Sequence, residues 1–259
     1  MKKNNALFKY SMKRIVSDNT GIIFAFLMPI GFYIAFSTLF NTGPDTQAMI
    51  QYLIPNYLLI IILNAVMNIF GMLLVSAEES GNLIKFRLMG ISKMKYSVAL
   101  FLCLLVLELI LIAFFLTFCV VFDGIRLPLN NLIPCLVILV VAHFLQFTLT
   151  MLLSALIKKA TTFSGVGLGL FMLQMFAGGL AIPVAMFPEN LRNILEMVNP
   201  VVRLSSALSN AWVGGESLSA NSTDILIVIA FSLVFLAGSL VIQRFNSNQA
   251  TIKPIRTAN

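Results

Sequence analysis

The stretch SAEESGNLIKFRLMGISKMK, residues 76–95, is a charged segment between two apolar segments that are each long enough to cross a bilayer. Ser76 is followed three residues later by Glu79, which is the spacing of a capping box at the start of a helix. Gly90 supplies a stop signal. The stretch therefore predicts a short helix of about three turns between two membrane spans.

The apolar residues of this predicted helix fall on two rows. Leu83, Phe86 and Met89 recur at spacing three, and Ile84 and Leu88 at spacing four, so little of the circumference is purely polar. Two interpretations are open: a connector that lies on lipid headgroups, or a helix inserted into a cleft of a soluble partner. The apolar rows favour the soluble partner, because a solvated loop would leave these apolar side chains exposed to water.

The composition indicates a polytopic membrane protein. Hydrophobic residues make up 59% of the 259 residues and charged residues 10%, with a mean hydropathy of +0.96, so a water-soluble core with a polar shell cannot be built. The excess of basic over acidic residues, 17 to 10, matters here through its position along the chain, and we expect no nucleic-acid binding. The three cysteines, Cys103, Cys119 and Cys135, lack metal-ligand spacing, so we expect no metal site.

Six apolar segments predict six transmembrane helices, since about twenty residues at about 1.5 Å rise span roughly 30 Å of hydrocarbon. They are residues 22–40, 52–75, 96–122, 132–157, 162–182 and 225–242. Pro29 lies inside the first segment and predicts a kink. The expected fold is an all-α membrane protein with one transmembrane domain over residues 1–259.

Residues 1–20 predict an amphipathic helix, here called the elbow helix, in the inner headgroup layer. Phe8, Met12 and Ile15 fall at spacings of four and three, with Lys9 and Lys13 on the other side. We expect no cleavable signal peptide, because no small-residue cleavage site follows the first apolar segment.

The positions of Lys and Arg predict which side of the membrane each loop faces. Fourteen of the 17 lie near the two termini, in residues 76–95 and at the pair Lys158 and Lys159, whereas only Arg126, Arg192 and Arg203 lie in the other loops. The positive-inside rule then puts both termini and residues 76–95 in the cytoplasm. We expect a multi-pass protein of the plasma membrane from a bacterial source.

Residues 183–222, between the fifth and sixth predicted spans, predict short helices on the outer side. Pro188 opens one helical pattern, and Asn199 caps a second with Pro200 at its first position. The second pattern carries the single tryptophan, Trp212, before two glycines. We expect both helices to lie at the outer interface or to dip into it.

Motifs for catalysis are missing from the sequence. It has no GxxxxGK[ST], HExxH, CxxC or GxSxG and only one histidine. The glycine-rich cradle that holds the phosphates during nucleotide hydrolysis is therefore missing too. We expect no catalytic residues, and if transport uses ATP, another chain hydrolyses it.

Six polar side chains fall near the middle of the predicted spans: Asn64, Asn68, Glu108, His143, Gln146 and Gln174. An ionised carboxylate at that depth costs roughly 2.5 to 3.5 kcal/mol, so we expect Glu108 to be protonated, paired or facing water, with His143 as its partner. Two interpretations are open. The six groups join helices by hydrogen bonds of about 0.6 to 2 kcal/mol each, or they line a transport path.

The fifth predicted span contains Gly165, Gly167 and Gly169, of which the outer two form a GxxxG motif. Small residues at spacing four let two helices approach closely. Packing within one subunit and a seam between two subunits are both open.

In their order along the chain, these features resemble the ABC (ATP-binding-cassette) transporter permeases of the type-2 exporter class. The resemblance covers nearly the whole chain. It rests on the basic amphipathic start, Pro29, the sequence EESG at 78–81, the run AGGLAIPVAMFP at 177–188, and Asn199 followed by Pro200. One departure is Gly90, where many relatives have a proline.

The resemblance implies a membrane subunit whose first cytoplasmic loop is a coupling helix in a groove of a separate ATPase subunit. The implied ATPase contacts are Glu78, Glu79, Gly81, Leu83, Ile84, Phe86 and Arg87. It also implies two ATPase copies that use ATP and Mg²⁺, no cofactor in this chain, and a second permease copy, identical or different, that completes the path.

We therefore expect the permease subunit of an ATP-driven exporter for an amphiphilic drug, antimicrobial peptide or lipid-like molecule. One alternative is an ion-coupled secondary transporter with Glu108 and His143 as a proton relay, although the inverted repeats typical of that class are not evident. Another is a non-transporting immunity protein that sequesters a peptide. The sequence leaves the substrate and the direction of transport open.

Overall fold

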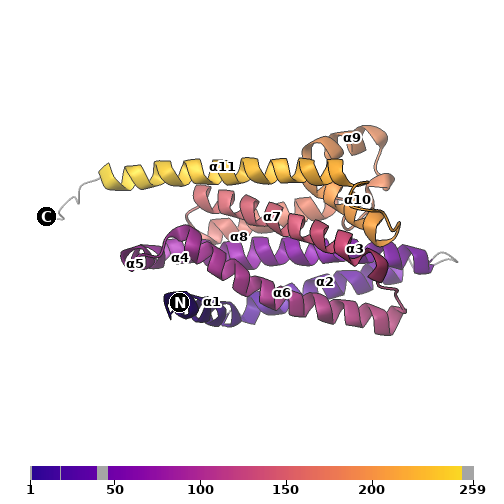
Figure 1. Cartoon of the computed structure of the whole chain (residues 1–259), viewed down its shortest axis with the longest axis horizontal. Coiled ribbons are helices and arrows are strands. Elements are labelled where there is room, and N and C mark those ends of the chain that lie inside the picture. The colour runs from indigo at the N-terminus through magenta and orange to yellow at the C-terminus, as the bar shows by residue number, and fades with distance from the viewer. Residues whose placement is uncertain (1, 18, 40–45, 253–259) are drawn as a thin grey trace.

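In the computed structural model, residues 2–17, 19–39 and 46–252 are described, and they form helices joined by turns, with no strand among them. The helices are α1 (Lys2–Val16), α2 (Asn19–Leu39), α3 (Thr46–Asn64), η1 (Ala65–Phe70), α4 (Gly71–Glu79), α5 (Asn82–Leu88), α6 (Lys93–Asp123), η2 (Leu129–Asn131), α7 (Leu132–Leu156), α8 (Ala160–Ala177), η3 (Val184–Met186), α9 (Glu189–Val198), α10 (Pro200–Trp212) and α11 (Ser222–Ile252). Figure 1 shows the long helices lying side by side along one axis. The all-helical prediction is confirmed for this part of the chain.

Five helical stretches of the described chain are long and apolar enough to cross a membrane. They are Leu53–Glu79, Lys93–Asp123, Leu129–Leu156, Ala160–Ala177 and Ser222–Phe245, and they correspond to the second to sixth predicted spans. α2 has 21 residues, with Pro29 inside it, and would reach roughly 30 Å at about 1.5 Å per residue. Phe40 and several α2 side chains lie outside the described residues, so a sixth span stays a prediction.

The predicted fifth span, 162–182, is too long at its C-terminal end. α8 ends at Ala177, and Gly179 has a φ of 78°, in the left-handed region that glycine adopts without strain. The backbone N–H groups of Leu180 and Ala181 both donate to the carbonyl of Met175, at 3.1 Å each, and close the turn. Because this glycine reverses the chain, the helix cannot continue to Ile182.

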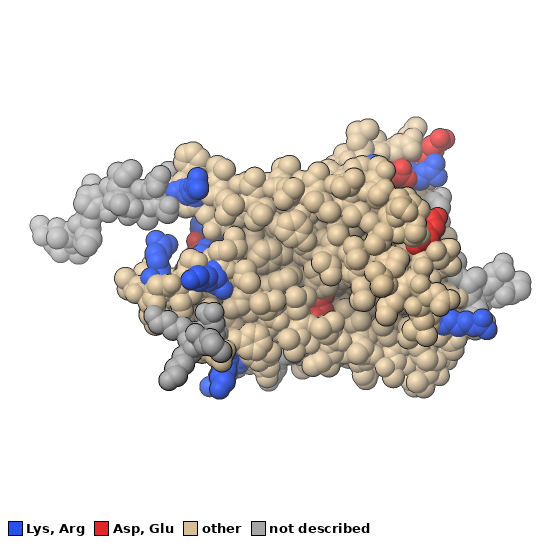
Figure 2. Space-filling view, viewed as in Figure 1, with Lys and Arg blue, Asp and Glu red and all other residues tan. Residues whose placement is uncertain are grey.

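The two ends of the helix bundle differ from its middle. In Figure 1, α1, α5 and the C-terminal end of α11 lie at one end of the molecule, and α9 and α10 lie at the other. Figure 2 shows the charged residues gathered at the two ends, with an uncharged surface between them that is broken by one small acidic area. Charged ends and an uncharged middle are what the sequence predicts, although Lys253 and Arg256 lie outside the described residues.

A helix forms within residues 1–20, but its buried face differs from the predicted one, and its place in the headgroup layer stays a prediction. α1 packs against the start of α6 and buries Leu7, Ser11 and Ile15, which recur at spacing four. Phe8, predicted for this face, is 37% exposed. The buried face starts at Leu7 and not at Phe8, because this side of the helix packs against α6. The Phe8 backbone also contacts α6, since the thiol of Cys103 donates to its carbonyl at 3.4 Å.

The capping-box interpretation of Ser76 and Glu79 is wrong. Both residues lie in α4, which continues the second span to Glu79, and the N–H of Ser80 donates to the carbonyl of Ser76 at 3.0 Å. The chain then reverses at Gly81, whose φ is 70°. The short helix α5 therefore begins at Asn82 and has 7 residues, about two turns rather than three.

The two helices predicted after the fifth span are both present, as α9 and α10. The side chain of Asn199 accepts a hydrogen bond from the N–H of Val201 at 3.1 Å, and Pro200 occupies the first position of α10. α9 has no buried residue, whereas α10 packs against α3, α7 and α11 and buries Trp212. α10 therefore belongs to the core at this end of the bundle, and the position of both helices relative to the membrane stays a prediction.

Two polar contacts hold α10 in this position. The hydroxyl of Ser205 donates to Asn56 Oδ1 on α3 at 2.7 Å, and both residues are buried. Arg203 Nη1 donates to Asp224 Oδ1 on α11 at 2.7 Å. α10 thus ties the second span to the last one at the end opposite α5.

We expect Asn199→Ala to destabilise the protein by about 1 to 2 kcal/mol, because its side chain caps α10 and also donates to the carbonyl of Ala177 at 3.0 Å. Thermal unfolding in detergent measures the effect as a melting temperature lowered by roughly 2 to 4 °C per kcal/mol. Asn193→Ala, on the exposed α9, is the control and should change stability by less than about 0.5 kcal/mol. Equal effects of the two substitutions would contradict the capping role.

Candidate docking surface and polar interior

α5 is fixed to the bundle by one apolar face. Leu83 is buried, and the ring of Phe86 stacks on Tyr96 of α6 with the centroids 5.1 Å apart. Tyr10 of α1 meets the same Phe86 ring edge-on at 5.4 Å. The sequence places these aromatic residues far apart, and the turn at Gly81 brings α5 back onto α1 and α6.

The opposite face of α5 is apolar and uncovered. Ile84 is 62% exposed, Leu88 is 85% exposed and Met89 is 53% exposed, with Lys85 and Arg87 exposed beside them. These five residues are called the docking surface below. Grouped apolar side chains on a charged end of a molecule mark an interaction site, because covering them yields roughly 25 cal/mol per Å² of apolar area.

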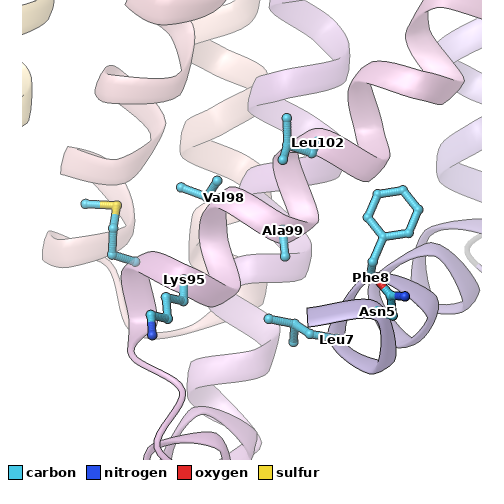
Figure 3. Close-up of a pocket in the computed structure, with 8 residues that line it drawn as sticks. Asn5, Leu7, Phe8, Lys95, Val98, Ala99 and Leu102 are labelled. Carbon is cyan, nitrogen blue, oxygen red and sulfur yellow. The ribbon is translucent and has the colours of Figure 1, made fainter. Parts of the chain in front are cut away.

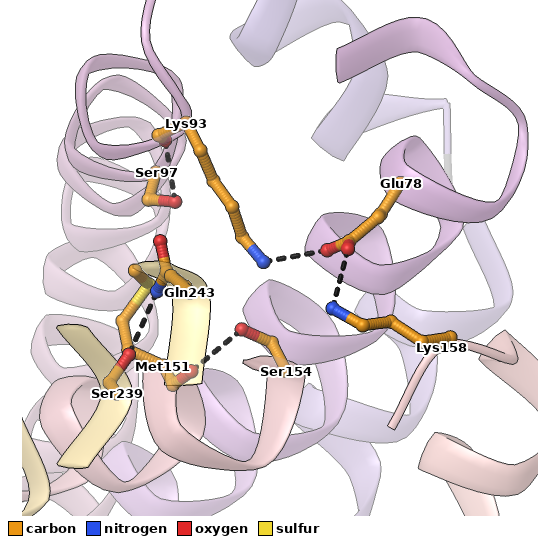
Figure 4. Close-up of polar contacts among 8 residues, drawn as sticks. All are labelled: Glu78, Lys93, Ser97, Met151, Ser154, Lys158, Ser239 and Gln243. Carbon is orange, nitrogen blue, oxygen red and sulfur yellow. Dashed lines mark hydrogen bonds and ion pairs between the residues drawn. The ribbon is translucent and has the colours of Figure 1, made fainter. Parts of the chain in front are cut away.

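A cluster of ion pairs lies at the end of α4, just before the turn that leads into α5. The carboxylate of Glu78, at the end of α4, accepts from Lys93 Nζ at 2.6 Å and from Lys158 Nζ at 2.6 Å. Figure 4 shows the two ammonium groups reaching the carboxylate from α6 and from the α7–α8 connection. Three segments that are distant in sequence therefore meet at one side chain, here called the Glu78 cluster.

Two further contacts extend the Glu78 cluster. Glu79 Oε2 accepts from the backbone N–H of Ala160 at 2.8 Å, where a carboxylate also interacts favourably with the dipole of α8. Arg14 Nη2 donates to the hydroxyl of Ser76 at 3.1 Å and joins α1 to α4. Glu78 and Glu79, predicted to contact an ATPase, thus make contacts inside the chain, and their contact with a partner stays a prediction.

Lys93, Lys158 and Arg14 are site residues that the sequence did not single out. Their charges served only to predict orientation, because Lys158 lies 80 positions from Glu78 and no local pattern links the two. One signal could have found them: Glu78 and Glu79 lie on the same predicted side of the membrane as an excess of Lys and Arg, so ion pairs between them were to be expected.

Glu108 of α6 and His143 of α7 are in contact, as the sequence predicts. Glu108 is buried, and its Oε1 lies 3.2 Å from His143 Nε2. His143 Nδ1 lies 2.7 Å from the carbonyl of Leu139, which can only accept, so Nδ1 carries a hydrogen. The contact therefore needs one further proton between Nε2 and Oε1, on either the imidazole or the carboxyl group.

The middle of the second span is a π-helix, which the sequence did not predict. η1 covers Ala65–Phe70, and Asn68 Nδ2 donates to Asn64 Oδ1 at 2.8 Å. A Cβ atom on Gly167 of α8 would lie 3.5 Å from Asn68 Oδ1, so the two helices approach closely here. Single-turn π segments inside α-helices are frequent at functional sites.

Four of the six polar residues predicted near mid-span form two pairs, whereas Gln146 and Gln174 belong to neither pair. The described hydrogen bonds join Asn64 to Asn68 and Glu108 to His143, and none joins the two pairs. Gln146 is fully buried, and neither of its amide atoms has a partner among the described residues. Buried polar atoms of this kind are normally satisfied by water or a ligand, so Gln146 marks a polar site in the interior.

The GxxxG motif does not pack within this chain. A Cβ atom added to Gly165 or Gly169 would meet nothing within 4 Å, whereas Gly167 faces η1. Close packing of Gly165 and Gly169 within the subunit, one of the two interpretations left open, is therefore wrong for the described part of the chain. The α8 face that carries both glycines is free for lipid or for a second chain.

The fold and the site define a multi-pass helical membrane protein with a docking surface at one end and polar side chains between its spans. Comparison with known proteins gives the class: residues 3–213 match the ABC-2 type transporter family, and the chain belongs to that family. A Bacillus subtilis (strain 168) protein, "Putative transport permease YvfS", is 26% identical over 245 residues, which cover 93% of this chain and 98% of the relative. The chain is thus a membrane subunit of an ABC transporter, in a family that generally partners with an ATPase subunit.

We expect Glu78→Gln to loosen the end of the bundle that carries α5, because it leaves the Lys93 and Lys158 ammonium groups facing each other without a carboxylate. The cost is about 1 to 2 kcal/mol for these partly exposed contacts. Hydrogen exchange followed by mass spectrometry should report faster exchange in residues 80–91.

Glu196→Gln is the matched control, since Glu196 lies 3.9 Å from Arg192 on the exposed α9 and should contribute less than about 0.5 kcal/mol. Unchanged exchange at residues 80–91 in the Glu78 variant would show that the Glu78 cluster does not hold α5 in place.

Proposed function

We propose that this chain is the transmembrane permease subunit of an ATP-driven exporter. It moves an amphiphilic substrate, such as a drug, an antimicrobial peptide or a lipid-like molecule, out of the cell, and a separate ATPase subunit hydrolyses ATP with Mg²⁺. The observation that carries the proposal is the docking surface, where Ile84, Leu88 and Met89 are exposed on a charged end of the bundle. Family membership supports an ATPase as the occupant.

α5 is the proposed coupling helix, within a cytoplasmic loop of residues 76–95. The residues that the resemblance implies as ATPase contacts divide into two groups by exposure. Ile84 and Arg87 face outward and make the contact, while Gly81, Leu83 and Phe86 shape and hold the helix. Leu88 and Met89 join the contact, although the resemblance alone did not name them.

The Glu78 cluster supports a route by which the motion of a partner reaches the spans. A push on α5 acts on α4 across the turn at Gly81 and on α6 through the stacked rings of Phe86 and Tyr96. The carboxylate of Glu78 links α4 to α6 and to the start of α8 through Lys158. η1 lies farther along the same span, where its π-helical turn is a suitable point for the span to bend.

The proposed topology has six spans in one permease domain over residues 1–259, with the elbow helix in residues 1–20 and the extracellular segment in residues 183–222. Both termini are cytoplasmic, and the protein lies in the plasma membrane of a bacterium. The placement of α1 and α5 at one end and α9 and α10 at the other supports this arrangement (Figure 1).

A complete transporter in this proposal contains two ATPase copies and a second permease copy, identical or different. The uncovered α8 face with Gly165 and Gly169 supports a close approach of a second chain. The path would then lie between the two permeases, with Asn64, Asn68, Glu108, His143, Gln146 and Gln174 as its candidate polar lining.

We expect Leu88→Asp to reduce the amount of ATPase that co-purifies with the chain by at least ten-fold, because it places a carboxylate in the apolar contact. The measurement is purification in mild detergent followed by quantitative mass spectrometry of any protein with a Walker motif. Leu129→Asp, at a 73% exposed position between α6 and α7, is the matched control. ATPase retention equal to that of the wild type would overturn the docking surface.

We expect Glu108→Gln to retain ATP-dependent export of a fluorescent amphiphile within about two-fold, because an amide can replace the carboxylate in the contact with His143 and keep the two helices joined. A large loss of ATP-dependent export at equal expression would instead give Glu108 a direct role in the transport path. Transport is measured in inside-out vesicles that contain equal amounts of protein. The secondary-transport alternative, which the Glu108–His143 contact keeps open, expects a pH gradient to drive transport without ATP and the variant to abolish it. That outcome would contradict the exporter proposal.

A further inference from the structure

A groove lies along the contact between the elbow helix and the start of α6. Its volume is about 480 Å³. The lining residues are Asn5, Leu7 and Phe8 of α1 and Met94, Lys95, Val98, Ala99 and Leu102 of α6. Figure 3 shows the α1 residues on one side of the groove and the α6 residues on the other. Neither the docking surface nor the six mid-span polar residues contribute to this lining.

The groove is polar at one end and apolar along the rest. Lys95, in the first turn of α6, is exposed, and no ion pair of its ammonium group occurs among the described residues. Glu78, an acidic residue of the same end of the bundle, is already paired with Lys93 and Lys158. Lys95 is therefore free to bind an anion, and the positive end of the α6 dipole adds to the attraction.

The apolar side of the groove continues along α6 toward the middle of the bundle. Val98, Leu102 and Val106 recur at spacing four and are between 41% and 48% exposed, and Leu109 and Ile110 follow on the same face. From Val98 to Ile110 the helix rises roughly 18 Å, somewhat more than half of a bilayer's hydrocarbon core of about 30 Å. The exposed row below Lys95 therefore matches the depth of one leaflet.

We propose that this groove binds an anionic phospholipid. Its phosphate accepts a hydrogen bond from Lys95 Nζ, and one acyl chain lies against Ala99, Leu102 and the ring of Phe8. A soluble partner does not fit the whole feature, because the row continues along a part of α6, residues 96–107, that carries no charged side chain. The anionic headgroup is favoured over a zwitterionic one because this end of the bundle carries excess Lys and Arg.

Native mass spectrometry of the full chain tests the proposal. The protein is purified in detergent with equal amounts of phosphatidylglycerol and phosphatidylcholine of the same acyl chains, and the retained lipids are counted. We expect about five-fold higher occupancy by phosphatidylglycerol, and we expect Lys95→Glu to abolish that preference. Ala99→Phe, which fills the groove with a ring, should remove the retained lipid whatever its headgroup.

Two control variants keep the charge and volume changes but move them away from the groove. Lys159→Glu reverses an exposed charge at the same end of the bundle, and Ala113→Phe adds a ring at an exposed position farther along α6. Both should retain phosphatidylglycerol as the wild type does. The proposal is overturned if Lys95→Glu and Ala99→Phe also retain it, or if the wild type binds both lipids equally. Loss of a co-purifying ATPase from Ala99→Phe, with the lipid count unchanged, would assign the groove to the ATPase instead.

Discussion

The contact of the Glu78 carboxylate with the ammonium groups of Lys93 and Lys158 is the interaction on which the architecture of the α5 end of the bundle depends. It joins the end of α4, the start of α6 and the α7–α8 connection, each of which would otherwise end freely at the membrane surface. α5 lies between the first two of these segments, so this carboxylate acts together with Leu83 and the Phe86–Tyr96 stack to orient the docking surface. A rigid base would suit the proposed coupling role of α5, because a push on a loosely held helix would move the helix and not the spans.

The interior of the bundle, unlike the end that carries α5, is held by few polar contacts and contains an irregular helix. The second span changes from α-helix to π-helix at Ala65–Phe70, two asparagines bind each other there, and Gln146 is buried without a partner among the described residues. Polar groups are costly inside a bilayer, and irregular helix is tolerated only where neighbouring helices or water satisfy the backbone. The chain therefore combines a firmly tied end with a middle that has spare hydrogen-bonding capacity. A transport subunit needs both features.

The end of the bundle opposite α5 is closed by α10, which buries Trp212 and hydrogen-bonds to α3 and α11. The sequence predicted this helix well, because Asn199 and Pro200 form a local start signal that needs no tertiary information. The same kind of local signal failed at Ser76 and Glu79. There the continuity of the membrane span prevailed, since a helix end inside or near the bilayer leaves backbone groups unsatisfied and the helix runs on until Gly81 can reverse it.

The sequence by itself determined the helical class, the positions of most spans, the presence of α9 and α10, and the separation of charged ends from an apolar middle. These features follow from composition, hydropathy and local caps, and all of them act over a few residues. Only the tertiary structure decided that Glu78 pairs with Lys158, that Phe86 stacks on Tyr96, that α10 is buried while α9 is not, and that Gly165 and Gly169 face outward. Each of these depends on which face one helix presents to another, and a uniformly apolar span has no periodicity that would reveal it.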